Sequence, residues 1–268
     1  MITSTNASAM WKSPQSEDSL ASDRTMGAGR LTGAVQLVAM LAPHERERMF
    51  QLLGENFTNT ARQRFEEDLT EKEWVILLRE EQCGVIQGFS TLMKLEVLLG
   101  DEQITAFFSG DTIIQRDFWG QTVLPRLWSR HVFHLAAALR SRKVYWFLIC
   151  SGYKTYRFLP VFFREFYPRY DRSTPGEIKQ LMDALGERKY QQEYDPASGV
   201  VRFDKPSALK EGIATITPGR LQDPHVAFFA KFNPGHVCGD ELVCITEISP
   251  DNVTSAGRRM IGEEEPYG

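Results

Sequence analysis

Polar residues that could carry chemistry gather directly after two apolar stretches of this sequence. Residues 110–112 (Gly-Asp-Thr) follow the apolar stretch 104–108, and residues 153–157, with two tyrosines, a lysine and an arginine, follow the apolar stretch 144–150. In open α/β sheets, ligand sites form beyond the carboxyl ends of neighbouring strands. We therefore expect these two polar segments to lie close together and to form the functional site.

The first of these segments contains the strongest candidate for proton transfer, Asp111. Its neighbours Phe107, Ile113 and Ile114 are apolar, and desolvation among them raises the pKa of an unpaired carboxyl group. Such a group can accept or hold a proton near neutral pH. Gly110, directly before it, suits a β-bulge or the close approach of a ligand. The alternative is that Asp111 caps the turn that follows.

The turn at residues 115–120 is a candidate anion site. It precedes a helical pattern, and a helix N-terminus presents free backbone N–H groups and the positive end of the helix dipole. Arg116 adds a positive charge, and Gly120 permits close approach of a ligand to the backbone. The alternative is an ordinary β–α connection with a glycine cap and a surface arginine.

The elements that position these residues follow from apolar periodicity. We expect helices at 44–57, 62–69, 124–139, 155–166 and 175–190, and strands at 74–78, 85–92, 104–114, 144–150, 200–203, 226–230 and 241–245. A hairpin that leads into a β–α–β–α unit indicates a mixed α/β sandwich. We divide the chain into an N-terminal arm (1–40), a core (41–172) and a part that completes the sheet as a strand-rich extension (173–268).

Composition restricts the class of protein. The chain has 268 residues, of which 42% are hydrophobic and 25% charged, as in ordinary globular domains. A net charge of −4 gives no basic field, so we expect no nucleic-acid partner. The N-terminus lacks a signal-peptide pattern and no apolar stretch is long enough to span a bilayer. We therefore expect a soluble, cytoplasmic protein with no transmembrane segment.

Other common chemistries lack their motifs. His236, Cys238 and Cys244 have no second close pair of ligands of the kind a zinc site needs, so we expect no metal. The sequence contains no nucleophile elbow, Walker A motif or dinucleotide fingerprint, which argues against a hydrolase, a nucleotidase or a dehydrogenase.

The element order and the turn at 115–120 resemble the GNAT superfamily of amine acyltransferases over residues 44–170. In that family the fourth strand runs into a pyrophosphate-binding turn of the form Gln/Arg-x-x-Gly-x-Gly/Ala, and a long helix follows. Gln115 and Gly120 match the first and last positions, whereas Phe118 stands at the middle glycine. A phenylalanine there would put bulk where phosphate would sit. This departure puts an unmodified coenzyme A site in doubt.

The resemblance implies the reaction class. The superfamily includes enzymes similar to N-acyl amino acid synthases, which take long acyl chains from acyl carrier protein. Residues 108–112 and 151–158 also resemble a GNAT-like group from bacterial natural-product gene clusters, which attaches fatty acyl chains to Lys or Orn side chains of ribosomal peptides. We therefore expect an N-acyltransferase of lipopeptide biosynthesis. Its donor would be a fatty acyl-CoA or acyl carrier protein, and its acceptor an amine of a peptide or amino acid.

The resemblance also implies roles for individual residues. Asp111 would be the general base or the anion that binds the amine. The family's acid is often a tyrosine on the helix after the fifth strand, where this chain has Phe163, so Tyr156 and Tyr153 are the substitutes. The residues expected to bind the donor are Gly110, Thr112, Gln115, Arg116, Trp119, Gly120, Lys154 and Arg157.

Two other functions stay open at this point. One is a non-catalytic module of GNAT type that binds an acyl chain or a carrier protein, favoured by the altered glycine pattern and by Phe163. The other is an acetyltransferase that moves acetyl groups from acetyl-CoA to a small amine. Turnover distinguishes the enzymes from the module, and preference for acyl chain length distinguishes the two enzymes.

Overall fold

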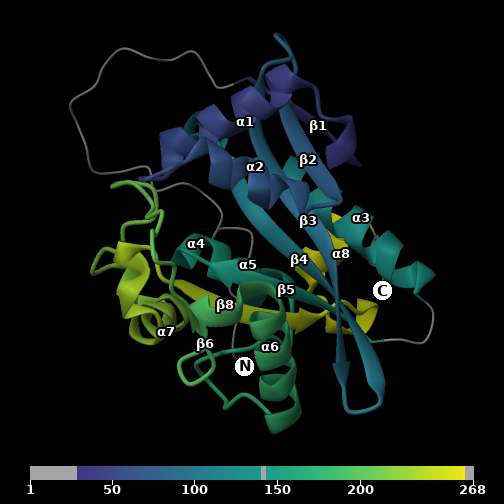
Figure 1. Ribbon diagram of the computed structural model, residues 1–268, viewed down its shortest axis with the longest axis vertical. Helices are drawn as coiled ribbons and strands as arrows, with labels where there is room; N and C mark the ends of the chain where they lie inside the picture. Colours follow the sequence, from purple (N-terminus) through teal and green to yellow (C-terminus); the bar gives the residue numbers. More distant parts are fainter. Residues whose placement is uncertain (1–28, 140–142, 263–268) are drawn as a thin grey trace, which may run out of the picture.

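The core of the protein is one mixed β-sheet (Figure 1). The computed structural model describes residues 29–139 and 143–262. The strands are β1 (Leu31–Leu37), β2 (Trp74–Glu80), β3 (Ile86–Leu99), β4 (Glu102–Ile114), β5 (Val144–Cys150), β6 (Tyr194–Asp195), β7 (Val200–Val201) and β8 (Glu241–Glu247). Their order in the sheet is β1-β2-β3-β4-β5-β8-β7-β6, and β4 and β5 run parallel. The predicted α/β class with a mixed sheet flanked by helices is confirmed.

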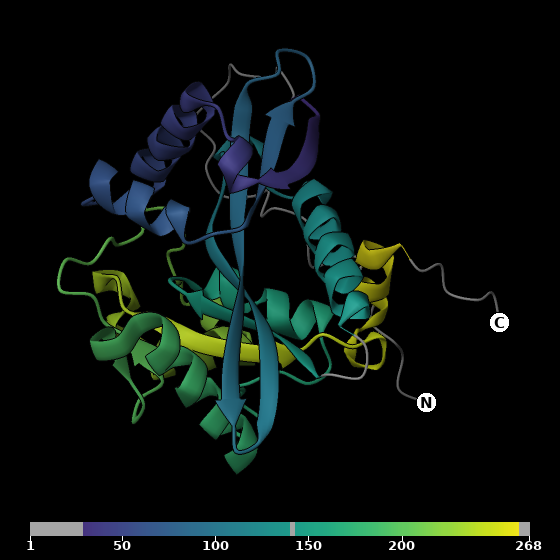
Figure 2. The ribbon, with the colours of Figure 1, turned by 45° about the vertical axis from the view of Figure 1, so that its right-hand side comes forward.

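Helices cover both faces of this sheet, as Figure 2 shows for α1 and α2 on one side and α3 and α8 on the other. The first face carries α1 (Pro43–Asn56), α2 (Arg62–Thr70) and α6 (Gly176–Tyr190). The second face carries α3 (Val123–Ala138), α4 (Tyr153–Tyr156), α5 (Phe158–Phe162), α7 (Pro224–Phe232) and α8 (Ser255–Ile261). Short 3₁₀ helices lie at Val38–Met40, Arg116–Phe118, Gln191–Glu193, Arg220–Gln222, Pro234–Cys238 and Pro250–Asn252. None of the helices in the described ranges is long and apolar enough to cross a membrane.

Strand β5 shows why the sheet must be covered on both faces. Successive side chains of a strand point to opposite faces, and β5 is apolar at every position. Trp146 and Leu148 pack into the core under α3, whereas Tyr145 and Phe147 pack into the core under α6. A continuous apolar strand is typical of such a two-sided burial.

The centre of the sheet contains a bulge followed by a fork. Ser90 of β3 pairs with Thr112 and Leu92 pairs with Ser109, so β4 carries one extra residue between these pairs. A Cβ at Gly110 would lie 2.5 Å from the Thr91 hydroxyl oxygen, so this position needs glycine. The prediction that Gly110 marks a bulge is confirmed.

The fork begins at the same place. The parallel pairing of β4 with β5 ends at Ser109 and Leu148. Beyond it β4 stays with β3 as far as Ile114, whereas β5 stays with β8 as far as Cys150. The two central strands therefore diverge at their carboxyl ends.

One predicted strand is a helix, and two other predicted elements have different boundaries. The apolar run 226–230, predicted as a strand, lies in helix α7, which Pro224 opens and the Asp223 side chain caps. An apolar run of this length has no period that separates a buried strand from a buried helix. The helix expected at 155–166 is two short helices, α4 and α5, and β7 is shorter than the strand expected at 200–203.

The ends of the chain differ from the predicted division in one respect. Residues 31–37, assigned to the arm 1–40, form edge strand β1, which pairs with β2 along its whole length. Residues 1–28 of the expected arm lie outside the described residues. Strands β6, β7 and β8 complete the sheet from the part expected to do so, although most of its regular structure is helical. The division between residues 172 and 173 stays a prediction.

Candidate active site

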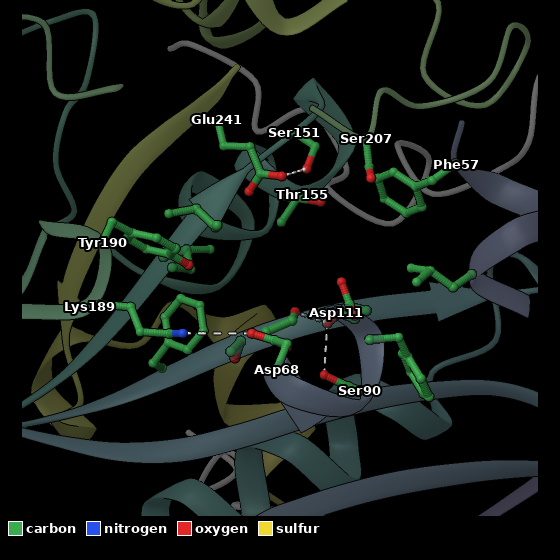
Figure 3. A pocket seen from close by; sticks show the side chains of 18 of the residues that line it. Phe57, Asp68, Ser90, Asp111, Ser151, Thr155, Lys189, Tyr190, Ser207 and Glu241 are labelled. Carbon is green, nitrogen blue, oxygen red and sulfur yellow. Dashed lines mark hydrogen bonds and ion pairs between the residues drawn. The ribbon is translucent and has the colours of Figure 1, made fainter. Parts of the chain in front are cut away.

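A cavity of about 770 Å³ lies at the fork between β4 and β5 (Figure 3). Its volume is in the range of small-molecule binding sites. Its walls come from both faces of the sheet: Trp128 of α3 and Phe162 of α5 on one face, Asp68 of α2 and Tyr190 of α6 on the other. The cavity therefore passes through the sheet where the two strands separate.

The half of the cavity under α3 and α5 is apolar and aromatic. The Trp128 and Trp146 rings lie 4.3 Å apart, and the Phe163 ring lies 5.8 Å from that of Trp146. Leu124, Leu148, Phe158 and Phe162 complete this wall. Phe163, which stands where the family's acid is expected, thus lines the cavity and brings no proton donor to it.

The half of the cavity under α2 and α6 is lined with charged groups, of which Asp68, Glu71 and Lys189 form ion pairs. Lys72 Nζ lies 2.7 Å from Asp68 Oδ1, and Lys189 Nζ lies 2.5 Å from Glu71 Oε2 and 3.6 Å from Asp68 Oδ1. The two lysines thus neutralise Asp68 and Glu71.

Asp111, the candidate base, lies in the bulge of β4 and lines the cavity. Burial, and then the charge of Asp68, raise its pKa to about 6, against the opposing effect of Lys72. Its side chain is available to a ligand in the cavity. The role predicted for Asp111 stays a prediction.

Glu241 is a second carboxylate of the site, and no local pattern in the sequence indicates it. It is the first residue of β8 and lines the cavity (Figure 3). Ser151 donates a hydrogen bond of 2.9 Å to Glu241 Oε1. Burial raises the pKa of Glu241 to about 7, and the charge of Asp111 adds to this effect. A carboxyl group that titrates near neutral pH is suited to general base catalysis.

The two tyrosines predicted as acids do not line the cavity. Tyr156 is fully buried, and its hydroxyl donates to the Pro168 carbonyl at 2.9 Å. Burial raises its pKa far above the ordinary value. Tyr153 is also buried in the core. Both side chains pack into the core under α4, so we correct their assignment as catalytic acids.

A different tyrosine, Tyr190 at the end of α6, lines the cavity. Its ring packs edge-on against Phe108 with 6.1 Å between centroids. Burial raises its pKa well above the ordinary value, so the phenol stays protonated and can donate. Tyr190 lies in the half of the cavity that contains the carboxylates of Asp111 and Glu241.

The turn at 115–120 does not line the cavity at any position. Phe118 is 6% exposed and packs into the core, so its bulk does not stand where phosphate would sit, contrary to the expectation. The backbone N–H groups of Phe118 and Trp119 donate to the carbonyls of Gln115 and Arg116. Gly120 closes the turn with a φ of +92°, which favours glycine.

The other predicted donor-binding residues divide into two groups. Gly110 and Thr112 line the cavity. Lys154 lies outside it, with its Nζ 3.6 Å from the centroid of the partly exposed Trp119 ring. Burial, and then the charges of Arg116 and Arg220, lower the pKa of Lys154 to about 8.

We correct the donor-binding role predicted for Arg157. Its guanidinium lies 3.2 Å from the carboxylate of Asp223, the residue that caps α7. It joins α4 to α7 and does not line the cavity.

Comparison with known proteins gives distant structural likenesses. No protein-family model and no curated protein matches the sequence. A protein of unknown function from Enterococcus faecalis, described as a probable N-acyltransferase, is 13% identical with a TM-score of 0.39; the match covers 81% of this chain and 65% of that one. The chain thus spans less than two thirds of that protein.

Two further solved structures with distant likeness are described as acyltransferases. A GNAT family N-acetyltransferase from Escherichia coli, in complex with CoA, is 14% identical with a TM-score of 0.34, over 48% of this chain and 68% of that one. The N-myristoyltransferase of Saccharomyces cerevisiae, with bound myristoyl-CoA, is 11% identical with a TM-score of 0.36. The match covers 72% of this chain and 49% of that one. At such distances none of them assigns a function to this chain.

Proposed function

We propose that this protein is an N-acyltransferase of GNAT type, which moves an acyl group from a phosphopantetheine thioester to an amine. The observation that carries the proposal is the cavity through the sheet. It joins an aromatic half to a half with two carboxylates of raised pKa, and they meet at the fork of β4 and β5.

The fork suits the pantetheine arm of a donor. Beyond Ser109 and Leu148, β4 and β5 no longer pair with each other, so the edges that face each other present backbone N–H and C=O groups. An extended ligand with amide groups can add to such an edge as a strand would. The aromatic wall beside the fork then receives the acyl chain, and its size and composition favour a fatty acyl group.

The carboxylate half suits the amine acceptor. An ammonium group is attracted to Asp111 and Glu241, the two carboxylates of this half with raised pKa. The ammonium group first loses one proton to water, which frees the nitrogen lone pair. Glu241 takes the second proton as the nitrogen attacks the thioester carbonyl carbon. The carbon–sulfur bond then breaks, and the thiolate, which accepts a hydrogen bond from the Tyr190 phenol, takes the proton held by Glu241. An amino group of a peptide or amino acid is the proposed acceptor.

The donor's phosphates would lie on the positively charged surface beside the turn at 115–120. Lys154 and Arg116 stand there around Trp119. Because Phe118 and Trp119 use their N–H groups within the turn, the nucleotide of coenzyme A gains few backbone contacts there. This favours a donor recognised through its pantetheine arm, as acyl carrier protein or acyl-CoA.

One alternative has specific support, namely a module that binds acyl groups without turnover. Phe163 lines the cavity where a tyrosine acid is expected, and the turn's N–H groups are occupied. Tyr190 on the opposite wall is the feature that separates the enzyme from the module.

Thermal unfolding with a panel of donors tests the donor half. The panel is coenzyme A, acetyl-CoA, palmitoyl-CoA and palmitoyl acyl carrier protein. A ligand present at about a hundred times its dissociation constant adds roughly 2.7 kcal/mol, a shift of several degrees for a chain of this size. Shifts with the palmitoyl donors alone support fatty acyl transfer. An equal shift with acetyl-CoA favours small-amine acetylation, and no shift with any donor contradicts the proposal.

A further inference from the structure

The hydroxyl group of Ser109 has an unusual hydrogen-bond environment. Ser109 is the last residue of β4 that pairs with β5, and it is 8% exposed. Its Oγ accepts one hydrogen bond from Trp128 Nε1 and one from Trp146 Nε1, each of 2.9 Å. Two indoles, one from α3 and one from β5, thus converge on a single oxygen.

These two bonds determine what the hydroxyl can still do. A serine hydroxyl has two acceptor sites and one proton to donate, whereas an indole N–H can only donate. Trp128 and Trp146 therefore occupy both acceptor sites of Ser109, and the proton must be directed elsewhere. Within residues 29–139 and 143–262, no hydrogen bond from Ser109 Oγ to an acceptor is found.

The cavity is where this proton can find an acceptor. Ser109, Trp128 and Trp146 all line it, on the aromatic side of the fork. A buried donor without a partner destabilises the protein, because its desolvation is not compensated by a hydrogen bond. A ligand that brings an acceptor atom to Ser109 recovers that cost.

We propose that Ser109, held by Trp128 and Trp146, forms a carbonyl-binding site whose hydroxyl donates to the carbonyl oxygen of an acyl ligand. The inference rests on the proposed function in taking this carbonyl to be that of the donor thioester. Ser109 stands directly before the bulge that carries Asp111, so a carbonyl held here lies between the aromatic and the carboxylate halves.

The two indoles also make the hydroxyl a better donor. Hydrogen bonds in a chain polarise one another, so an oxygen that accepts two of them releases its own proton more readily to an acceptor. As an amine adds to the thioester, negative charge develops on the carbonyl oxygen. A donor fixed beforehand at that oxygen stabilises the transition state more than the ground state.

The test observes the carbonyl group directly. The probe is the ketone analogue of myristoyl-CoA in which a methylene replaces the thioester sulfur, with ¹³C at the carbonyl. On binding to the wild-type protein, the carbonyl ¹³C resonance moves downfield and its infrared stretch moves to lower frequency. Ser109→Ala loses both shifts while the probe stays bound.

Two further variants keep the test independent of folding. Ser109→Ala leaves two indoles without an acceptor and can fail to fold, whereas Trp128→Phe keeps the hydroxyl and frees one of its acceptor sites. We expect Trp128→Phe to bind the probe with reduced shifts. Ser90→Ala is the matched control, because the Ser90 hydroxyl already pairs with Thr112 at 2.8 Å, and it retains the full shifts.

Turnover gives a second readout. Loss of one donor to a developing oxyanion lowers kcat by about 10²- to 10³-fold, so Ser109→Ala lowers kcat by that factor with little change in KM. A probe that binds wild-type protein without shifts, or shifts that persist in Ser109→Ala, would overturn the carbonyl site and leave the acyltransferase proposal standing. Failure of the probe to bind wild-type protein would overturn both.

Discussion

Replacement of Glu241 by glutamine should make the protein more stable and less active at the same time. The carboxylate is partly buried, it accepts a hydrogen bond from the Ser151 hydroxyl, and its pKa is raised from 4.5 to about 7. Glutamine has the same shape and keeps an oxygen that can accept from Ser151. The substitution therefore removes the charge and leaves the packing in place.

The size of the stability gain follows from the pKa and depends on pH. In the unfolded chain Glu241 ionises near 4.5, and in the folded protein near 7. Ionisation thus favours unfolding increasingly between these two values, and at about 1.4 kcal/mol per pKa unit the full penalty is about 3 kcal/mol. Glu241→Gln should gain that amount at pH 8, a rise in Tm of roughly 6–12 °C, and only about 1 kcal/mol at pH 5.

The assay is urea unfolding of both proteins at pH 5 and pH 8. Glu102→Gln is the matched control, because Glu102 is exposed at the start of β4. A stability difference that is absent at pH 8, or equal at both values of pH, would refute the assignment of Glu241 as a desolvated carboxylate. Loss of the general base should lower turnover by about 10²- to 10⁴-fold and remove the rise in rate near pH 7.

Three other substitutions test separate parts of the site. The charge of Asp111 raises the pKa of Glu241, so Asp111→Asn should move the rising limb of kcat/KM to lower pH; an unmoved limb would show that the two carboxylates act independently. Gly110→Ala places a Cβ 2.5 Å from the Thr91 hydroxyl oxygen and should cost about 1–3 kcal/mol in urea unfolding, whereas a neutral result would contradict the tight bulge. Tyr156→Phe removes one buried hydrogen bond and should lower the free energy of unfolding by about 1–2 kcal/mol; a loss of turnover in protein that is still folded would restore its catalytic role.

Local patterns were sufficient for the central strands. The glycine within a strand predicted the bulge at Gly110, and the apolar run 144–150 predicted a strand covered on both faces. The polar segment 110–112 does line the cavity, as expected from its place near the carboxyl end of a strand. These features depend on neighbours in sequence, and therefore they can be predicted from sequence.

The rest of the site depends on contacts between distant segments. Glu241 reaches the cavity because β8 runs antiparallel to β5, which brings its first residue beside the last residues of β5. Tyr190 reaches it because α6 packs across the sheet. Phe118 turns into the core because α3 and the sheet provide an apolar space beneath the turn. No local spacing encodes these pairings, so the sequence alone directed attention to Tyr153 and Tyr156 instead.

Direct detection of the transferred acyl group is the measurement that tests the central claim. The protein is incubated with [¹³C]myristoyl-CoA and a peptide that carries one lysine and one ornithine, and the peptide mass and the released thiol are followed together. The account predicts one N-acylated product per thiol released, with both lost in Glu241→Gln. Binding of myristoyl-CoA to the wild-type protein with neither product nor amine-dependent thiol release would contradict it and favour the binding module.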